Sequence, residues 1–216
     1  MVNLTRIYTR TGDDGTTALG DFSRTTKTDR RLIAYADTDE ANSSIGVALT
    51  CGALREDVRT VLVRIQNDLF DIGADLCTPL AASYEYPPLR VKDTWVDELE
   101  ADCDRFNNEL EKLRSFILPG GTPGSAYLQV ARTVARRAER SAWTALETYG
   151  DQPAPDASPK GTGGINPLTA KYLNRLSDLL FILGRVANLP IGGDVLWQPG
   201  GGRAHGGSEN QPAPEN

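Results

Sequence analysis

The chain has 216 residues, enough for one domain with a substantial core and too few for two full domains. Its 23 basic and 29 acidic residues leave a net charge of −6, which argues against general binding to nucleic acid or to an anionic membrane. Residues 1–8 lack the apolar stretch of a signal peptide, and no later run approaches the roughly 18 apolar residues of a membrane-spanning helix. We therefore expect a soluble cytoplasmic protein.

The cysteines and the single histidine limit the possible chemistry. Cys51, Cys77 and Cys103 are not spaced as a zinc site or a redox pair, which favours ordinary buried or half-buried thiols in a reducing compartment. His205 lies in a polar segment near the end of the sequence. A Ser-His-Asp triad, a histidine-ligated di-iron site and a histidine general base in the core are therefore excluded.

Residues 1–28 contain turn-forming and hydroxyl residues without a helical period, which predicts a loop or a short extended arm. Their densest part is TRTGDDGTT at positions 9–17, where glycines allow backbone N–H groups to approach an anion. Arg10, the hydroxyls and Lys27 are suited to binding phosphate oxygens. The segment lacks the Gly-Lys-Ser/Thr of a Walker A loop, so an ordinary turn is the alternative.

The rest of the chain shows helical periodicity and contains no segment with the alternation of a β-strand. Thr122 followed by Pro123 predicts a sharp start to the fourth helix. A core-facing stripe of the second helix consists of Val58, Leu62, Ile65, Leu69, Ile72 and Leu76. We expect helices at about residues 29–49, 55–77, 92–113, 123–149 and 167–188.

Five helices in one domain predict an all-α fold, a single helical bundle. We divide the chain into an N-terminal arm at residues 1–28, a bundle at residues 29–190 and a flexible tail at residues 191–216. The connection at residues 151–166 is rich in proline and glycine, and we assign it no catalytic role.

Two polar faces occur in the last two helices. We call the first the arginine stripe; it consists of Arg132, Arg136, Glu139 and Trp143, flanked by Arg140. Because Arg132 and Arg136 are like charges at i, i+4, they destabilise a helix slightly unless an anion lies against them. The second face consists of Asn174, Asp178, Phe181 and Arg185. The two faces could meet around a ligand; a solvated surface or ion pairs between subunits are the alternatives.

Five motifs along the chain resemble the PduO-type ATP:corrinoid adenosyltransferase family. They are TRTGDDGTT at 9–17, AYADTDEAN at 34–42, FILPGG at 116–121, VARTVARRAER at 130–140 and NRLSD at 174–178. The motifs occur in order on the expected loops and helices, and the resemblance extends over roughly residues 5–188.

This resemblance implies a five-helix bundle that assembles as a homotrimer, with ATP and Mg²⁺ between neighbouring subunits and a corrinoid above the ATP. The enzyme would transfer the 5′-deoxyadenosyl group of ATP to Co(I) of cobalamin or a related corrinoid, forming adenosylcobalamin and releasing triphosphate. Mg²⁺ would be held through the ATP phosphates. One subunit would bind ATP through Thr9, Arg10, Thr11, Gly12, Thr17 and Lys27. Its neighbour would bind it through Arg136, Arg137, Glu139, Arg140 and Asn174.

The same resemblance implies catalytic roles for Arg132, Asp39 and Phe116. Arg132 matches an arginine that forms an intersubunit salt bridge with the aspartate matching Asp39, which helps to position the polyphosphate. Phe116 matches an aromatic residue that covers the lower face of the corrin and excludes its lower axial ligand. The resulting four-coordinate Co(II) is more easily reduced to Co(I), the nucleophile. The implied partners are a reductase and an adenosylcobalamin-dependent mutase.

Two other functions fit parts of the sequence. A non-catalytic corrinoid escort would deliver the cofactor to a mutase, although the anion-binding loop and the arginine stripe argue against binding alone. A structural bundle would use its arginines only to join subunits. One departure from the family pattern also matters: Asp14 stands where relatives often carry lysine, so one phosphate contact is lost or replaced.

Overall fold

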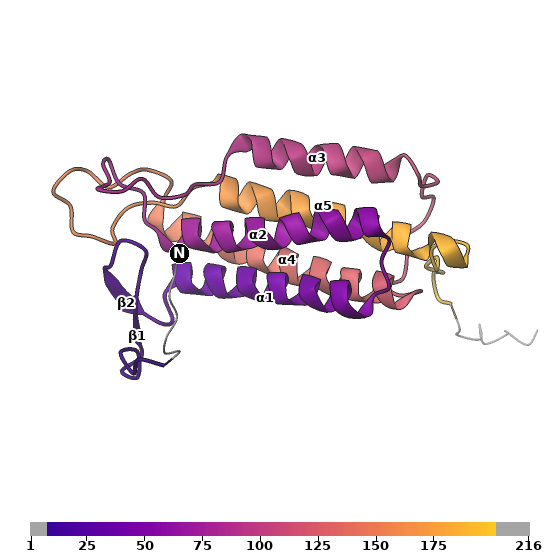
Figure 1. The fold of residues 1–216 in the computed structure, drawn as a ribbon, viewed down its shortest axis with the longest axis horizontal. Helices are drawn as coiled ribbons and strands as arrows, with labels where there is room; N and C mark the ends of the chain where they lie inside the picture. Colours follow the sequence, from indigo (N-terminus) through magenta and orange to yellow (C-terminus); the bar gives the residue numbers. More distant parts are fainter. Residues whose placement is uncertain (1–7, 202–216) are drawn as a thin grey trace, which may run out of the picture.

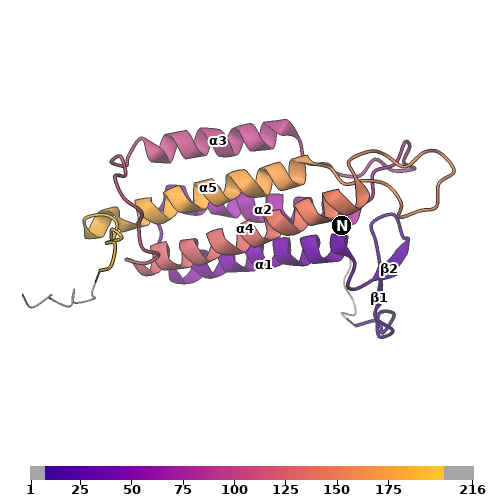
Figure 2. The same ribbon diagram turned by 180° about the vertical axis from the view of Figure 1, so that it is seen from behind.

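The five predicted helices are present in the computed structural model, which describes residues 8–201 (Figure 1). They lie side by side along a common direction, as both views show (Figures 1 and 2). α1 packs against α2 and α4, while α5 packs against α4 and α3, so α3 lies at the edge of the bundle. The helices are α1 Arg30–Cys51, α2 Glu56–Cys77, α3 Asp93–Asn107, α4 Pro123–Tyr149 and α5 Leu168–Asn188, followed by a short 3₁₀ turn, η1 Leu189–Ile191.

The core forms where the apolar stripes of the helices meet. All six residues of the predicted α2 stripe are buried, which confirms the periodicity. α1 contributes small buried residues, including Ala34, Ala41 and Ala48, and these allow α4 to approach closely. Within residues 8–201, none of the helices has both the length and the apolar character needed to cross a membrane.

The third helix ends six residues earlier than the sequence predicted, at Asn107 rather than near Leu113. Beyond it, the Glu109 N–H donates to the Phe106 carbonyl and the Leu110 N–H to the Asn107 carbonyl, which are three-residue turns rather than helical bonds. Glu109 also forms a salt bridge with Arg55 at 2.7 Å. These contacts turn the chain away from the helical path and towards the start of α2.

The N-terminal arm contains a hairpin that the sequence did not predict. β1 Thr16–Ala18 pairs antiparallel with β2 Arg24–Thr26, and Thr17 lies opposite Thr25. Strands of three residues are too short to show a recognisable alternation. The hairpin fixes the position of the TRTGDDGTT loop beside the N-terminal end of α1 (Figure 1).

The cysteines only partly match the expectation of buried or half-buried thiols. Cys77 and Cys103 are half-buried, and burial raises the pKa of the Cys103 thiol to about 12. Cys51 is exposed, so the expectation was wrong there. The reason is its position at the last residue of α1, beyond the helices that cover the rest of that face.

We expect Thr122→Ala to destabilise the protein by about 1–2 kcal/mol, measured as the free energy of unfolding in urea. The Thr122 hydroxyl accepts from the Ser125 N–H at 3.1 Å, which caps α4, and it donates to the Ala187 carbonyl at 3.0 Å. Thr148→Ala is the matched control, because Thr148 is exposed near the other end of α4 and bonds only within its own helix. Equal losses in the two variants would show that the cap contributes nothing specific.

Candidate active site

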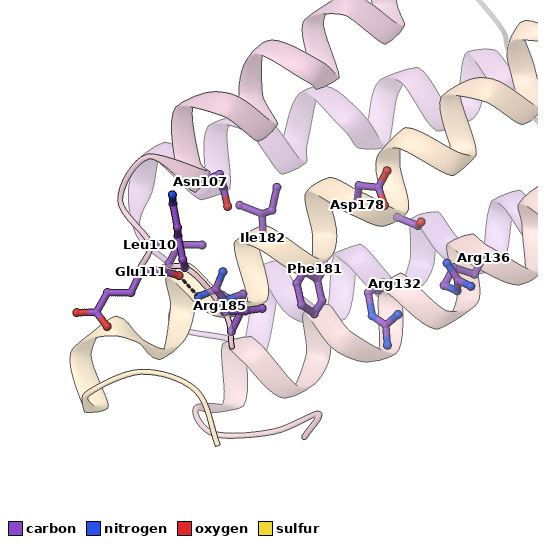
Figure 3. A pocket seen from close by; sticks show the side chains of 12 residues that line it. Asn107, Leu110, Glu111, Arg132, Arg136, Asp178, Phe181, Ile182 and Arg185 are labelled. Atoms are coloured by element: carbon purple, nitrogen blue, oxygen red, sulfur yellow. Dashed lines mark hydrogen bonds between the residues drawn. The ribbon is translucent and has the colours of Figure 1, made fainter. Parts of the chain in front are cut away.

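A groove of about 580 Å³ lies between α4, α5 and the chain that follows α3 (Figure 3). Arg132 and Arg136 line it from α4, one turn apart, and Phe181 of α5 lies beside them (Figure 3). The other lining residues are Asn107, Leu110, Glu111, Lys112, Leu113, Ser177, Asp178, Ile182 and Arg185. Parts of the two polar faces predicted from helical spacing therefore meet in one cavity, whereas Glu139, Trp143 and Asn174 lie outside its lining.

The Arg132 side chain is oriented by a hydrogen bond to the buried side-chain amide of Gln129. Its Nε donates to Oε1 of Gln129 at 2.7 Å, and Gln129 is 4% exposed. Gly184 of α5 leaves room for this amide, since a Cβ there would lie 3.0 Å from the Gln129 Nε2. Burial and the nearby Arg136 lower the pKa of Arg132. The groove therefore contains two neighbouring positive charges, an arrangement that an anion would stabilise.

The other residues expected to bind ATP from this subunit lie in different environments. Arg137 turns away from the groove and forms salt bridges with Asp37, at 3.3 Å, and with Glu40 of α1, and these carboxylates raise its pKa. Glu139 accepts a hydrogen bond from the Asn174 amide at 3.0 Å, which links α4 to α5. Arg140 is exposed. Of the predicted set, Arg136 lines the groove, and the remaining four lie outside its lining.

The TRTGDDGTT loop is held in a tight, polar conformation. The hydroxyls of Thr9 and Thr11 are 2.9 Å apart, and Arg24 of β2 donates to the Thr11 carbonyl at 2.8 Å. Arg10 adopts a positive φ of 62°. The Lys27 side chain lies against Gly12, where a Cβ would come within 3.2 Å of Nζ. The structure thus places the Lys27 ammonium beside the loop.

The Asp14 carboxylate forms hydrogen bonds within this loop. Its Oδ1 accepts from the N–H of Thr16 at 3.0 Å and from the Thr16 hydroxyl at 2.7 Å, and these bonds lower its pKa. Arg24 lies 3.7 Å from the same carboxylate oxygen. Asp14 therefore stabilises the turn itself.

The loop and the groove do not meet within one chain. The hairpin lies at one end of the bundle and the connection between α3 and α4 lies at the other (Figures 1 and 2). None of the residues lining the groove comes from the hairpin or the loop. Asp39 is exposed on α1, and within residues 8–201 no salt bridge joins it to Arg132.

Phe116 lies on the connection between α3 and α4, and its ring is 78% exposed. A segment beyond η1, residues 194–197, pairs with this connection; we call it the C-terminal segment. The Leu118 N–H donates to the Val195 carbonyl and the Trp197 N–H to the Phe116 carbonyl, both at 2.8 Å. The Trp197 ring meets the Phe116 ring edge-on, with 6.0 Å between centroids. Sequence reasoning placed these residues in a flexible tail and missed the pairing; the apolar run Val-Leu-Trp was the available signal.

Comparisons with known proteins give a consistent result. The model of the cobalamin adenosyltransferase family matches residues 7–187. A corrinoid adenosyltransferase of Mycobacterium tuberculosis is 59% identical over 202 residues, covering 94% of this chain and 97% of that protein. The corrinoid adenosyltransferase PduO of Salmonella typhimurium is 38% identical over 182 residues, covering 83% of this chain and 48% of that protein.

A solved structure has the same architecture. A variant of the PduO-type ATP:corrinoid adenosyltransferase from Lactobacillus reuteri, complexed with cobalamin and ATP, superimposes with a TM-score of 0.76. The two chains are 32% identical, and the match covers 89% of this chain and 99% of the other. Both ligands of that complex are large, and one of them carries a polyphosphate.

Proposed function

The chain belongs to the cobalamin adenosyltransferase family, and from this membership we propose how its groove, its loop and Phe116 divide the work of adenosyl transfer. The protein is an ATP:corrinoid adenosyltransferase, which moves the 5′-deoxyadenosyl group of ATP onto the cobalt of a corrinoid. The observation that carries the residue assignment is the pair Arg132 and Arg136, which line the groove and form no salt bridge within residues 8–201.

The arginine pair binds the polyphosphate of ATP in this proposal. Triphosphate leaves when the Co(I) electron pair attacks C5′ and the C5′–O bond breaks, so negative charge develops on the leaving oxygen. A half-buried guanidinium such as that of Arg132 stabilises such charge strongly and needs no rearrangement during the reaction. Gln129 fixes Arg132 for this task, and Arg136 lies one turn further along α4.

The flanking residues complete the nucleotide site. Glu139 and Asn174 already form a pair between α4 and α5, which gives a donor and an acceptor for the adenosine moiety. Arg140 is exposed and free to approach a phosphate. Arg137 is bound to Asp37 and Glu40, so a direct phosphate contact would require it to leave them. Until it does, it fixes α1 against α4.

The second half of the nucleotide site comes from a neighbouring subunit of a homotrimer. The loop residues form a hydroxyl-rich turn with two cationic side chains, and none of them lines the groove of the same chain; they are Thr9, Arg10, Thr11, Gly12 and Thr17, with Lys27. Placed against the groove of the next subunit, this turn would enclose the phosphates from the other side. Asp39, exposed on α1, would then pair with Arg132 across the interface.

Phe116 serves the corrinoid rather than the nucleotide. An exposed ring on a loop is suited to covering one face of a flat macrocycle, where it excludes water and an axial ligand. Loss of that ligand gives a four-coordinate Co(II) that is reduced more easily. The corrinoid supplies the nucleophile, so this chain supplies position, positive charge and exclusion of water.

The surrounding requirements follow from the same chemistry. Mg²⁺ would arrive with ATP and be bound by its phosphates, which supply the oxygen ligands that this hard cation prefers. A reductase must supply the electron that gives Co(I), and an adenosylcobalamin-dependent mutase is the expected recipient of product. We place the reaction in the cytoplasm, where ATP and reducing power coexist.

The test is anaerobic incubation of the purified protein with chemically reduced cob(I)alamin, ATP and Mg²⁺. We expect ATP-dependent formation of the cobalt–carbon bond, seen as an absorbance change faster than in the enzyme-free reaction, together with release of triphosphate. Omitting ATP gives the matched control. A folded protein that binds cobalamin without converting it would instead be an escort, and one that binds neither ligand would be a structural bundle.

A further inference from the structure

A buried ion pair joins the end of α5 to the chain beyond it. Arg185 and Asp194 are both 8% exposed in their side chains, and the Arg185 Nε donates to the Asp194 Oδ2 at 2.8 Å. A second nitrogen of the same guanidinium donates to the Glu111 carbonyl at 2.8 Å, a contact drawn in Figure 3. Arg185 thus holds both the C-terminal segment and the start of the connection between α3 and α4.

Asn188 ties the same two parts of the chain together one turn later. Its amide nitrogen donates to the Gly120 carbonyl at 3.0 Å and to Asp194 Oδ1 at 3.3 Å, while its amide oxygen accepts from the Thr122 N–H at 3.0 Å. Gly121 has a φ of +101°, and a Cβ there would lie 2.3 Å from the Asn188 Oδ1. Glycine is therefore required where the loop passes over this amide.

The residue after Asp194 begins the pairing with the loop that carries Phe116. Val195 accepts from Leu118, and Trp197 donates to the Phe116 carbonyl and meets its ring edge-on. The Phe116 ring is 78% exposed, so the hydrophobic core does not fix its direction. Instead, the C-terminal segment forms a hydrogen bond with the Phe116 carbonyl and makes the one aromatic contact of its ring within residues 8–201.

We propose that Arg185, Asp194 and Asn188 form a positioning cluster that fixes the C-terminal segment and, through it, the ring of Phe116. This inference rests on the proposed function for the role of the ring itself. Apolar side chains could stabilise this place equally well, because the free energy lost when two charges are removed from water offsets much of the free energy gained from their attraction. The cluster's directional bonds set the register of residues 194–197 against residues 116–118, which an apolar contact would leave free to slide.

The test uses the full chain labelled with fluorotryptophan and the variant Asp194→Asn. The chain has 3 tryptophans, so three fluorine resonances are expected, and Trp197→Phe identifies one of them. We expect Asp194→Asn to shift or broaden the Trp197 resonance and to leave those of Trp95 and Trp143 in place. With cobalamin and ATP as substrates, we expect kcat to fall about tenfold, because the ring is displaced by a fraction of its width. The KM for ATP should stay within about twofold, since the arginine pair is untouched.

Asp93→Asn is the matched control, because Asp93 forms an exposed salt bridge with Lys171 at 3.3 Å. It should change neither the Trp197 resonance nor kcat. Arg185→Lys keeps the charge but cannot bond Asp194 and Glu111 as a fork, and it replaces Asp194→Asn as the test if that variant does not fold. A Trp197 resonance or a kcat at the wild-type value in a folded cluster variant would overturn the proposal. Absence of adenosylation by the unmodified protein would instead defeat the proposed function, while the fluorine resonance would still decide whether the cluster orders the segment.

Discussion

Replacing Arg132 with alanine is expected to lower kcat for adenosyl transfer by about 100- to 1,000-fold, the usual cost of removing one fixed group that stabilises developing negative charge. The guanidinium is half-buried in the groove, is oriented by Gln129 and lies next to a second positive charge on Arg136. Its loss leaves the leaving triphosphate with one of the two groove arginines. Steady-state rates with reduced cobalamin and varied ATP measure the effect.

The same substitution should leave the fold intact. Arg132 forms no salt bridge within residues 8–201, and its burial beside a like charge lowers its pKa, so removing it relieves repulsion. We expect the free energy of unfolding to change by less than about 1 kcal/mol. Arg59→Ala is the matched control, because Arg59 is also half-buried and bonds to the Leu49 carbonyl, but it lies on α2. Wild-type kinetics in a folded Arg132→Ala protein would remove this residue from the mechanism.

A double-mutant cycle distinguishes the intersubunit role of Arg132 from a purely local one. If Asp39 of the neighbouring subunit pairs with Arg132, the losses caused by Asp39→Asn and Arg132→Ala will not add, because each variant already breaks the pair. Additive losses would show that the two residues act separately. Asp39 is suited to the measurement because it is exposed and makes no salt bridge of its own within the described chain.

Helical spacing places Arg132 and Arg136 on one face of α4, as the structure shows, but it does not tell which neighbouring element each arginine of that helix contacts. Arg132 and Arg136 differ by four residues and share a face, so both line the groove. Arg137 is rotated by about 100° from Arg136, which turns it towards α1 and its carboxylates. The motif alone gives no sign of that division, because it places both arginines in one run of sequence.

The elements that the sequence did not predict depend on contacts between distant residues. The α3 helix stops at Asn107, where the following turns and the Arg55–Glu109 salt bridge redirect the chain. The hairpin strands are three residues each, too short for a periodic signal. The C-terminal segment pairs with a loop almost 80 residues earlier, and its ion pair with Arg185 is visible only once both are folded. Each of these contacts borders the proposed site.

The two halves of the site differ in how their charges are arranged. In the TRTGDDGTT loop, Asp14 accepts hydrogen bonds from Thr16, and the Lys27 ammonium lies against Gly12. In the groove, the Arg132 guanidinium is bound by the buried Gln129 amide, and neither Arg132 nor Arg136 forms a salt bridge within residues 8–201. Cationic side chains brought together from two subunits repel each other unless an anion lies between them. ATP would thus favour assembly of the site from two subunits as well as fill it.

Replacing Phe116 with alanine is expected to lower kcat by about 100-fold while leaving the KM for ATP within about twofold, because Phe116 lies on a loop and is not among the residues that line the groove with the arginine pair. The cobalt spectra should change in parallel: the four-coordinate Co(II) signal that we expect from the unmodified protein with ATP should be lost or strongly reduced. Stability should change by less than about 0.5 kcal/mol, since the ring is 78% exposed.

Phe70→Ala is the matched control for this experiment, because Phe70 is 70% exposed on α2 and distant in sequence from the loop. Comparison with Asp194→Asn then separates two explanations for any loss of activity. If the ring acts by covering one face of the corrin, Phe116→Ala, which removes the ring, must lower kcat more than Asp194→Asn, which only displaces it. Both variants must also lose the same cobalt signal. A Phe116→Ala protein that keeps the four-coordinate signal would show that the Co(II) ligand is excluded by another part of the protein, and the role of the C-terminal segment would have to be sought in ATP binding.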